Sequence, residues 1–412
     1  LIFLQDLLPD VKQAQQLRER QRWNENFIIP SADKINPHTN DKTPDRRLRI
    51  GYVSGDFYRH SASQGFSPLI MEHDRDGFDV ICYDNNPGND EISHALRSSA
   101  SDWRETRELD DDALADIIRE DAIDILVDLS GHTRDNRLKM FAQKPAPIQV
   151  TGIGHLAPGL NTIDYRLTTP VLTPPEEQDL YPEQPIYLKT FFGLSGLEAA
   201  PAVASLPCLK NGFLTFGFLG RHTKITTQVI ATWARILADT PSSRLLLKHR
   251  LLDNPQEIEK TRAEFSAHGI SEDRLDLLGT TDRLTHLAAH NNVDIVLDTF
   301  PHGGGITALE SLWMGTPLIG THDANKVGGR IASMIMAPLD LGDWVVNTPG
   351  EYIATAVSWQ NRMDTLSQIR EELRPRLSKL YGCFTRDVEA AYVEIWSRWC
   401  RDEQPSAVNA VC

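Results

Sequence analysis

The chain of 412 residues has few cysteines, more acidic than basic residues, and no long apolar run. Its five cysteines are odd in number and scattered, with no C-x-x-C pair. This distribution argues against a disulfide framework or a structural zinc site and favours a reducing compartment, so we expect a cytoplasmic protein. No stretch approaches the roughly 18–20 apolar residues of a membrane-spanning helix. We therefore expect no membrane partner.

The charge balance limits the kinds of partner. With 42 Lys and Arg against 57 Asp and Glu residues, the net charge is −15. A nucleic-acid partner requires a basic face, so none is expected, although a local basic pocket for a small phosphate ligand remains possible. Residues 1–4 lack the flanks of a signal peptide, and there is no initiator methionine. The chain is therefore expected to be a soluble fragment of a longer one.

Several catalytic signatures are also missing. The sequence has no G-x-G-x-x-G motif, no P-loop ending in G-K-[ST] and no G-x-S-x-G elbow, which weakens dehydrogenase, ATPase and serine-hydrolase interpretations. His286 and His290 stand at i, i+4, but the glutamate of H-E-x-x-H is missing, so we expect no metal there. The acidic run 110–112 begins a predicted helix, where it suits the helix dipole.

The chain does contain two series of short apolar runs that alternate with helical patterns. The predicted strands are 48–54, 78–83 and 123–127 in the first series, and 213–219, 243–248, 275–278, 293–297 and 317–320 in the second. Such alternation predicts parallel sheets covered by helices on both faces. Seven prolines between residues 168 and 207 mark a boundary near residue 205. The expected domains are 1–47 (helical segment and linker), 48–205, 206–400, and a frayed tail at 401–412.

The strongest local signal is a buried strand that runs into three glycines, Gly303 to Gly305, before a helix begins. Glycines let the backbone approach a ligand closely, and the N–H groups at a helix start favour a phosphate. Thr307 can donate its hydroxyl to the same oxygens, and Glu310 is placed to hold a ribose hydroxyl. A tight turn without a ligand is the alternative.

Two further groups of polar residues follow predicted strands. Arg221 and Lys224 follow the strand at 213–219, where cations could neutralise a leaving diphosphate; a solvated turn is the alternative. In the first domain, residues 55–60 and 128–132 each follow a strand and should reach the same cleft. Both segments carry a histidine and a carboxylate, the usual proton-handling groups, although a single histidine is often structural.

Taken together, these segments resemble the catalytic region of the O-linked N-acetylglucosamine transferase/SPINDLY family (glycosyltransferase family 41). The matching blocks are 48–57 with His60 behind it, 124–133, 145–151, 164–166, 293–301 and 310–317. The resemblance implies an α/β protein with the GT-B fold, in which two facing Rossmann-like domains transfer a sugar from a nucleotide donor without a metal or other cofactor. It also implies that residues 1–27 are the end of a tetratricopeptide region.

The resemblance, together with the local signals, also assigns site residues. The implied catalytic residues are His60, Asp128, His132 and Lys224. The implied donor-binding residues are Arg221, Thr281, Arg283, His286, Gly304, Gly305, Ile306, Thr307 and Glu310. The implied reaction is inverting transfer of N-acetylglucosamine from UDP-N-acetylglucosamine to Ser or Thr of a protein. GDP-fucose or UDP-glucose are alternative donors, and a catalytically weak sugar-nucleotide or peptide-binding scaffold is an alternative of another class.

The sequence departs from the family pattern in three places. Residues 152–156 are Gly-Ile-Gly-His-Leu where relatives have Trp-x-Gly-Tyr-Pro, and residues 219–221 are Leu-Gly-Arg where Phe-Asn-Asn or Phe-Asn-Gln is common. Residues 305–308 are Gly-Ile-Thr-Ala in place of a threonine-rich run. All three lie around the expected donor and acceptor pockets, so they bear on the identity of the sugar more than on the fold.

Overall fold

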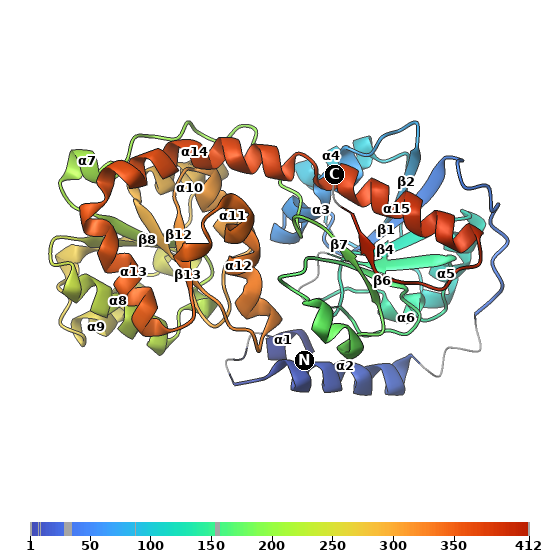
Figure 1. Ribbon diagram of the computed structural model, residues 1–412, viewed down its shortest axis with the longest axis horizontal. Coiled ribbons are helices and arrows are strands. Elements are labelled where there is room, and N and C mark those ends of the chain that lie inside the picture. The colour runs from blue at the N-terminus through green and yellow to red at the C-terminus, as the bar shows by residue number, and fades with distance from the viewer. Residues whose placement is uncertain are drawn as a thin grey trace. The chain divides into compact units, whose positions relative to one another are not determined.

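The computed structural model describes residues 2–6, 8, 10–28, 35–86, 88–152 and 157–410. The chain divides into two compact units (Figure 1). Unit 1 comprises Leu1–Ser195 and Leu380–Cys412, and unit 2 comprises Gly196–Lys379. Each unit is an α/β domain with its own parallel sheet. Across the described residues, no helix combines the length and the apolar character needed to cross a membrane.

In unit 1 the described residues form an eight-stranded sheet in the order β14-β7-β6-β5-β4-β1-β2-β3, with every neighbouring pair parallel. The strands are β1 (Leu48–Ser54), β2 (Phe78–Asp84), β3 (Asp102–Glu105), β4 (Ile125–Asp128), β5 (Ile148–Thr151), β6 (Tyr165–Thr168), β7 (Gln184–Tyr187) and β14 (Val408–Asn409). The three apolar runs predicted as strands form β1, β2 and β4, because central parallel strands are buried on both faces.

Helices connect and cover these strands. The helices of unit 1 are α1 (Ile2–Asp6), α2 (Gln13–Phe27), α3 (Ser61–Met71), α4 (Glu91–Ser99), α5 (Asp111–Glu120), α6 (Leu138–Phe141) and α15 (Phe384–Cys400). Asp90 and Asp110 cap the first turns of α4 and α5, a position in which aspartate is common. Ile118, Leu126 and Phe141 are fully buried in the core between α5, α6 and the sheet.

Unit 2 contains a second parallel sheet, in the order β10-β9-β8-β11-β12-β13. Its strands are β8 (Thr215–Leu219), β9 (Arg244–Lys248), β10 (Leu275–Leu278), β11 (Ile295–Leu297), β12 (Leu318–Thr321) and β13 (Val345–Val346). Its helices are α7 (Pro207–Asn211), α8 (Thr227–Asp239), α9 (Pro255–Ser266), α10 (Arg283–Ala289), α11 (Ile306–Trp313), α12 (Ile331–Met336), α13 (Pro349–Ser358) and α14 (Met363–Tyr381), which ends in unit 1. The five runs predicted as strands in the second domain correspond to β8 through β12.

The boundary between the units lies earlier than the expected residue 205. The chain leaves unit 1 after Ser195. The proline-rich segment before this point includes β7 and adds to the first sheet. Ser195 Oγ donates to the carbonyl oxygen of Gln64 at 3.0 Å, and Gly193 N–H donates to that of Gly65 at 2.8 Å. These bonds hold the end of the segment to α3.

The C-terminal part of the chain also differs from the expected domains, because residues 380–412 belong to unit 1 and not to the second domain. In Figure 1 α15, coloured red, lies along the unit that contains β4 and β6. His73 joins it to the sheet, since Nδ1 donates to Glu389 at 2.9 Å and Nε2 accepts from the Tyr52 hydroxyl at 2.7 Å. The expected frayed tail includes β14, which pairs with β7. Pairing at this sheet edge orders the chain through Asn409.

Candidate functional site

A loop of unit 2 is folded around a buried carboxylate. The glycine loop, which we define as residues 298–305, follows β11 and leads directly into α11. Asp298 is only 3% exposed. Its carboxylate accepts from the backbone N–H of Thr299 at 2.8 Å and from that of Gly304 at 2.9 Å to each oxygen. These bonds fix the loop so that it ends at the positive N-terminal end of α11.

Close packing explains why residues 303 and 304 of the glycine loop are glycines. A Cβ atom at Gly303 would lie 2.9 Å from Asp298 Oδ2, and one at Gly304 would lie 2.9 Å from Thr307 Oγ1. Thr307 is in the first turn of α11 and is half-buried. The glycines therefore let the loop fold tightly over Asp298 while Thr307 stays next to it.

Lys224 is bound to the glycine loop. It lies on the short helix His222–Lys224 after β8, the neighbour of β11 in the sheet. Its Nζ donates to the carbonyl oxygen of Gly303 at 2.6 Å. Burial lowers the pKa of Lys224 to about 8, against the attraction of Asp298, while the positive charge of Arg221 lowers it further. The structure thus places Lys224, the cation predicted to neutralise a diphosphate, against the glycine loop, which was predicted to bind a phosphate.

Glu310 forms the centre of a second polar group on α11 and α10. Its side chain is buried, with Arg283 Nη1 at 2.5 Å from Oε1 and His286 Nε2 at 3.5 Å from Oε2. Burial by itself raises the pKa of Glu310, but the contacts with His286 and Arg283 outweigh it and leave the pKa below its usual value. Glu310 is therefore an ionised carboxylate held in a fixed orientation.

The remaining predicted donor residues are placed less specifically. Gly305 and Ile306 are half-buried at the start of α11. Arg221 is exposed beside Lys224. Thr281 is also exposed, next to the cap of α10, and its hydroxyl donates to the carbonyl oxygen of Asp282 at 3.2 Å. Within the described residues, none of the hydrogen bonds or ion pairs found connects Thr281 with the glycine loop.

In unit 1, the loops after β1 and β4 meet, as their positions after neighbouring parallel strands predict. Gly55 N–H donates to Ser130 Oγ at 3.3 Å. His60 caps α3, with Nδ1 accepting from the N–H of Ala62 at 3.3 Å and lying 3.6 Å from Asp56 Oδ1. The His60 side chain is 33% exposed, so solvent reaches it. Burial raises the pKa of Asp56, while the His60 charge opposes the shift.

Asp128 and His132 have more enclosed surroundings. Asp128 is buried, and its carboxylate accepts from the N–H groups of Ser130 and Gly131 and from the Thr151 hydroxyl. It therefore holds the loop that carries His132. The His132 Nε2–H donates to the carbonyl oxygen of Pro158 at 3.1 Å, and burial lowers the pKa to about 4. These contacts fit a role in shaping the loop better than proton transfer.

Two functional features were missed by sequence reasoning. Asp298 was noted only as part of the matching block 293–301, although an aspartate between a buried strand and three glycines is a signal for a loop anchor. His290 was considered only as half of a metal pair. Its ring centroid lies 6.0 Å from that of His286, and across the described residues no group of three His, Cys, Asp or Glu side chains could hold a metal. Of the three sequence departures, residues 153–156 lie outside the described residues.

Comparisons with known proteins identify the family. The family model described as Glycosyl transferase family 41 matches residues 28–196 and 208–385. A probable UDP-N-acetylglucosamine–peptide N-acetylglucosaminyltransferase SPINDLY from Solanum lycopersicum is 34% identical over 381 residues, covering 89% of this chain and 40% of that protein. The protein of the same description from Eustoma exaltatum subsp. russellianum is 36% identical over 386 residues, covering 89% and 41%. The chain thus spans about two fifths of these relatives.

Solved structures agree with the family and the fold. A mutant O-GlcNAc transferase from Thermobaculum terrenum has a TM-score of 0.86 and 34% identity, covering 94% of this chain and 75% of that one. Anabaena HepE, solved with UDP and glucose, has a TM-score of 0.56 at 12% identity, covering 84% and 100%, and supports the fold alone. The two Rossmann-like units are those of the GT-B fold. The chain belongs to glycosyl transferase family 41.

Proposed function

We propose that this chain is the catalytic region of a protein O-glycosyltransferase, which transfers N-acetylglucosamine from UDP-N-acetylglucosamine to Ser or Thr hydroxyl groups. The observation that carries the proposal is the bond between Lys224 and the glycine loop at the N-terminus of α11. Beside it, Glu310 is held by Arg283 and His286. The names of the SPINDLY relatives, which specify this donor and a peptide acceptor, support the same function.

The proposed reaction is a displacement with inversion. The bond between the anomeric carbon and the β-phosphate oxygen breaks as the acceptor oxygen bonds to that carbon from the opposite face. Negative charge develops on the departing diphosphate, where the Lys224 ammonium, the N–H groups at the start of α11 and the Thr307 hydroxyl would stabilise it. Glu310 would accept hydrogen bonds from the ribose hydroxyls. The proposal requires no metal or other cofactor.

His60 and Asp56 are the proposed proton-handling pair in unit 1. Because Nδ1 of His60 accepts from Ala62, Nε2 carries the proton in the neutral ring. That arrangement suits a hydrogen bond donated to an acceptor or sugar oxygen. Asp56 lies beside it, and its raised pKa moves this carboxylate toward the range of a general base. Asp56 would take up the acceptor's proton, while the neutral His60 ring donates from Nε2 and orients the substrate.

We expect His60→Asn to lower peptide glycosylation by roughly 10²-fold, the scale of losing a group that orients the reacting atoms. Asparagine is a good helix cap, so α3 should stay capped and the melting temperature should change little. His94→Ala, at an exposed histidine of the same unit, is the control and should retain full turnover. Unchanged transfer by the His60→Asn variant would remove His60 from the mechanism.

The donor can be identified by thermal shift with UDP, GDP, UDP-N-acetylglucosamine, UDP-glucose and GDP-fucose. A ligand at 100 times its dissociation constant stabilises the folded state by about 2.7 kcal/mol, so the donors can be ranked. We expect UDP and UDP-N-acetylglucosamine to give the largest shifts. Mass spectrometry of a Ser/Thr peptide library should then show added N-acetylhexosamine. A shift with GDP and GDP-fucose alone would replace the proposed donor.

The pre-formed contact between Arg283 and Glu310 favours one alternative function. If this ion pair stays closed, the chain would bind a sugar nucleotide weakly and serve as a scaffold for peptides. UDP binding without transfer to any peptide would support that alternative.

The location and partners of the whole protein are also proposals. Because of its cysteine usage we propose a cytoplasmic location, and because of its net charge we propose no nucleic-acid partner. The proposed protein or peptide acceptor rests on the names of the SPINDLY relatives.

A further inference from the structure

His290 is a buried histidine with unsatisfied hydrogen-bonding capacity. It follows α10 and is 1% exposed. Neither ring nitrogen has a hydrogen-bond partner among the described residues. Burial lowers the pKa of His290 to about 3, so the ring is neutral at physiological pH and presents one N–H donor and one acceptor. Buried polar groups of this kind are nearly always bonded to protein or to ordered water.

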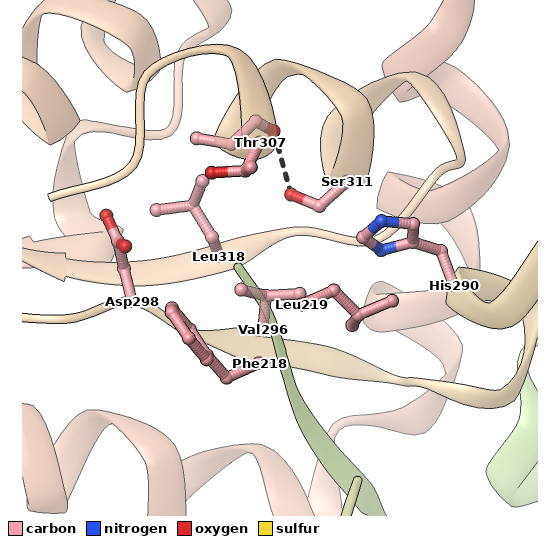
Figure 2. A pocket seen from close by; sticks show the side chains of 9 residues that line it. Phe218, Leu219, His290, Val296, Asp298, Thr307, Ser311 and Leu318 are labelled. Carbon is pink, nitrogen blue, oxygen red and sulfur yellow. Dashed lines mark hydrogen bonds between the residues drawn. The ribbon is translucent and has the colours of Figure 1, made fainter. Parts of the chain in front are cut away.

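The imidazole borders a small cavity beneath α11. The cavity lies between α11, β8, β11 and β12, and its polar lining comes from His290, Asp298, Thr307 and Ser311. Figure 2 shows the His290 ring turned toward Ser311, with Asp298 at the opposite end of the lining residues. The remaining wall is formed by apolar side chains, including Val296 and Leu318.

The size and chemistry of the cavity match one water molecule. The cavity has a volume of about 10 Å³, close to the least that a bound water requires. The Ser311 hydroxyl donates to the carbonyl oxygen of Ala308 at 2.8 Å, so its oxygen can still accept. A water molecule can accept from one nitrogen of His290, or donate to the other, while it bonds to a hydroxyl of α11.

We propose that His290 is a positioning residue for the phosphate site: it binds one water molecule in this cavity, and the water connects its ring to the hydroxyl groups of Thr307 and Ser311. Because Thr307 is in the first turn of α11, the water fixes the hydroxyl that meets the donor phosphate. The inference rests on the proposed function, in which Thr307 contacts the diphosphate. His286, one turn earlier, faces Glu310 instead, so the two histidines serve different parts of the site.

Two measurements on the full chain test this. A high-resolution crystal structure should show a water within hydrogen-bond distance of a His290 ring nitrogen and of Thr307 or Ser311. Calorimetry should show that His290→Phe weakens UDP binding about five- to tenfold, the scale of one hydrogen bond, and leaves uridine binding unchanged because uridine has no phosphate. His290→Gln, which keeps a donor and an acceptor, should restore most of the loss.

A double-mutant cycle separates positioning from general stability. If His290 acts through Thr307, then His290→Phe should have little effect on UDP binding in a Thr307→Val background. Equal losses for UDP and uridine, an undiminished loss in the Thr307→Val background, or a cavity without water would each overturn the assignment. A wild-type chain that binds neither UDP nor uridine would refute the proposed function, whereas normal UDP binding by His290→Phe would refute only the role of His290.

Discussion

Replacement of Lys224 by alanine is expected to lower the turnover of sugar transfer about 100-fold, the scale of losing one contact made to developing charge. Lys224 is fixed by its bond to the Gly303 carbonyl in the glycine loop, which precedes α11. The charge on the leaving diphosphate is greater in the transition state than in the bound donor, so the loss should fall mainly on turnover and less on the affinity for UDP-N-acetylglucosamine. Initial rates with UDP-N-acetylglucosamine and a peptide acceptor measure it.

The pH dependence of the wild-type chain provides an independent check. The pKa of Lys224 is lowered to about 8 by burial, so the ammonium is present below pH 8 and is lost above it. The ratio kcat/KM for the donor, which reports the free enzyme, should therefore fall as the pH rises through about 8. Lys224→Arg should remove this alkaline limb, because a guanidinium stays charged.

A matched lysine makes the comparison specific. Lys210 is exposed on α7 of the same unit, and Lys210→Ala should leave both the turnover and the pH profile unchanged. Full activity in Lys224→Ala would exclude Lys224 from stabilising the leaving group. An alkaline limb that persists unchanged in Lys224→Arg would assign the limb to another group.

Replacement of Asp298 by alanine should cause a large loss of local stability around the glycine loop of unit 2. The substitution leaves the buried N–H groups of Thr299 and Gly304 without their acceptor, and each such group costs about 1–3 kcal/mol. It also removes the charge that attracts Lys224. We expect about 3 kcal/mol less protection from hydrogen exchange in β11 and α11, together with loss of UDP binding by calorimetry.

Two control variants show how specific this effect is. Asp276→Ala removes a half-exposed partner of Arg244 in the same unit, and it should cost no more than about 1 kcal/mol. Asp298→Asn keeps one acceptor oxygen and should give an intermediate loss of protection. Wild-type exchange rates and UDP affinity in Asp298→Ala would show that the glycine loop does not depend on this carboxylate.

The predictable parts of the fold are those with a strong apolar signal. The runs at 48–54 and 213–219 were predicted as strands because central parallel strands bury both faces. β7, in contrast, lies within a proline-rich segment, and β13 and β14 have two residues each, too few for a pattern. The attachment of α15 to unit 1 depends on a contact such as that of His73 with Glu389, which joins positions far apart in the sequence.

In the candidate site, too, the positions of the loops could be predicted from the strand pattern, whereas the side-chain contacts could not. Because β8 and β11 were both predicted as parallel strands, Lys224 and the glycine loop could be assigned to one edge of a sheet. That Lys224 bonds to Gly303, and that Glu310 is already engaged by Arg283 and His286, depends on how side chains pack in three dimensions. His132 also packs against α2, where the Trp23 and His132 rings lie edge to face with their centroids 4.9 Å apart. This contact likewise joins positions far apart in the sequence.

The split of unit 1 across the sequence affects how the protein is made. Unit 2 is one continuous segment, Gly196–Lys379, so a ribosome completes it while unit 1 still lacks residues 380–412. Until then His73 has no Glu389 to bond and β7 has no neighbour on one side. Domains generally fold as units during synthesis. Unit 2 can therefore finish folding first, and unit 1, although its synthesis begins earlier, reaches its final form only with the last part of the chain.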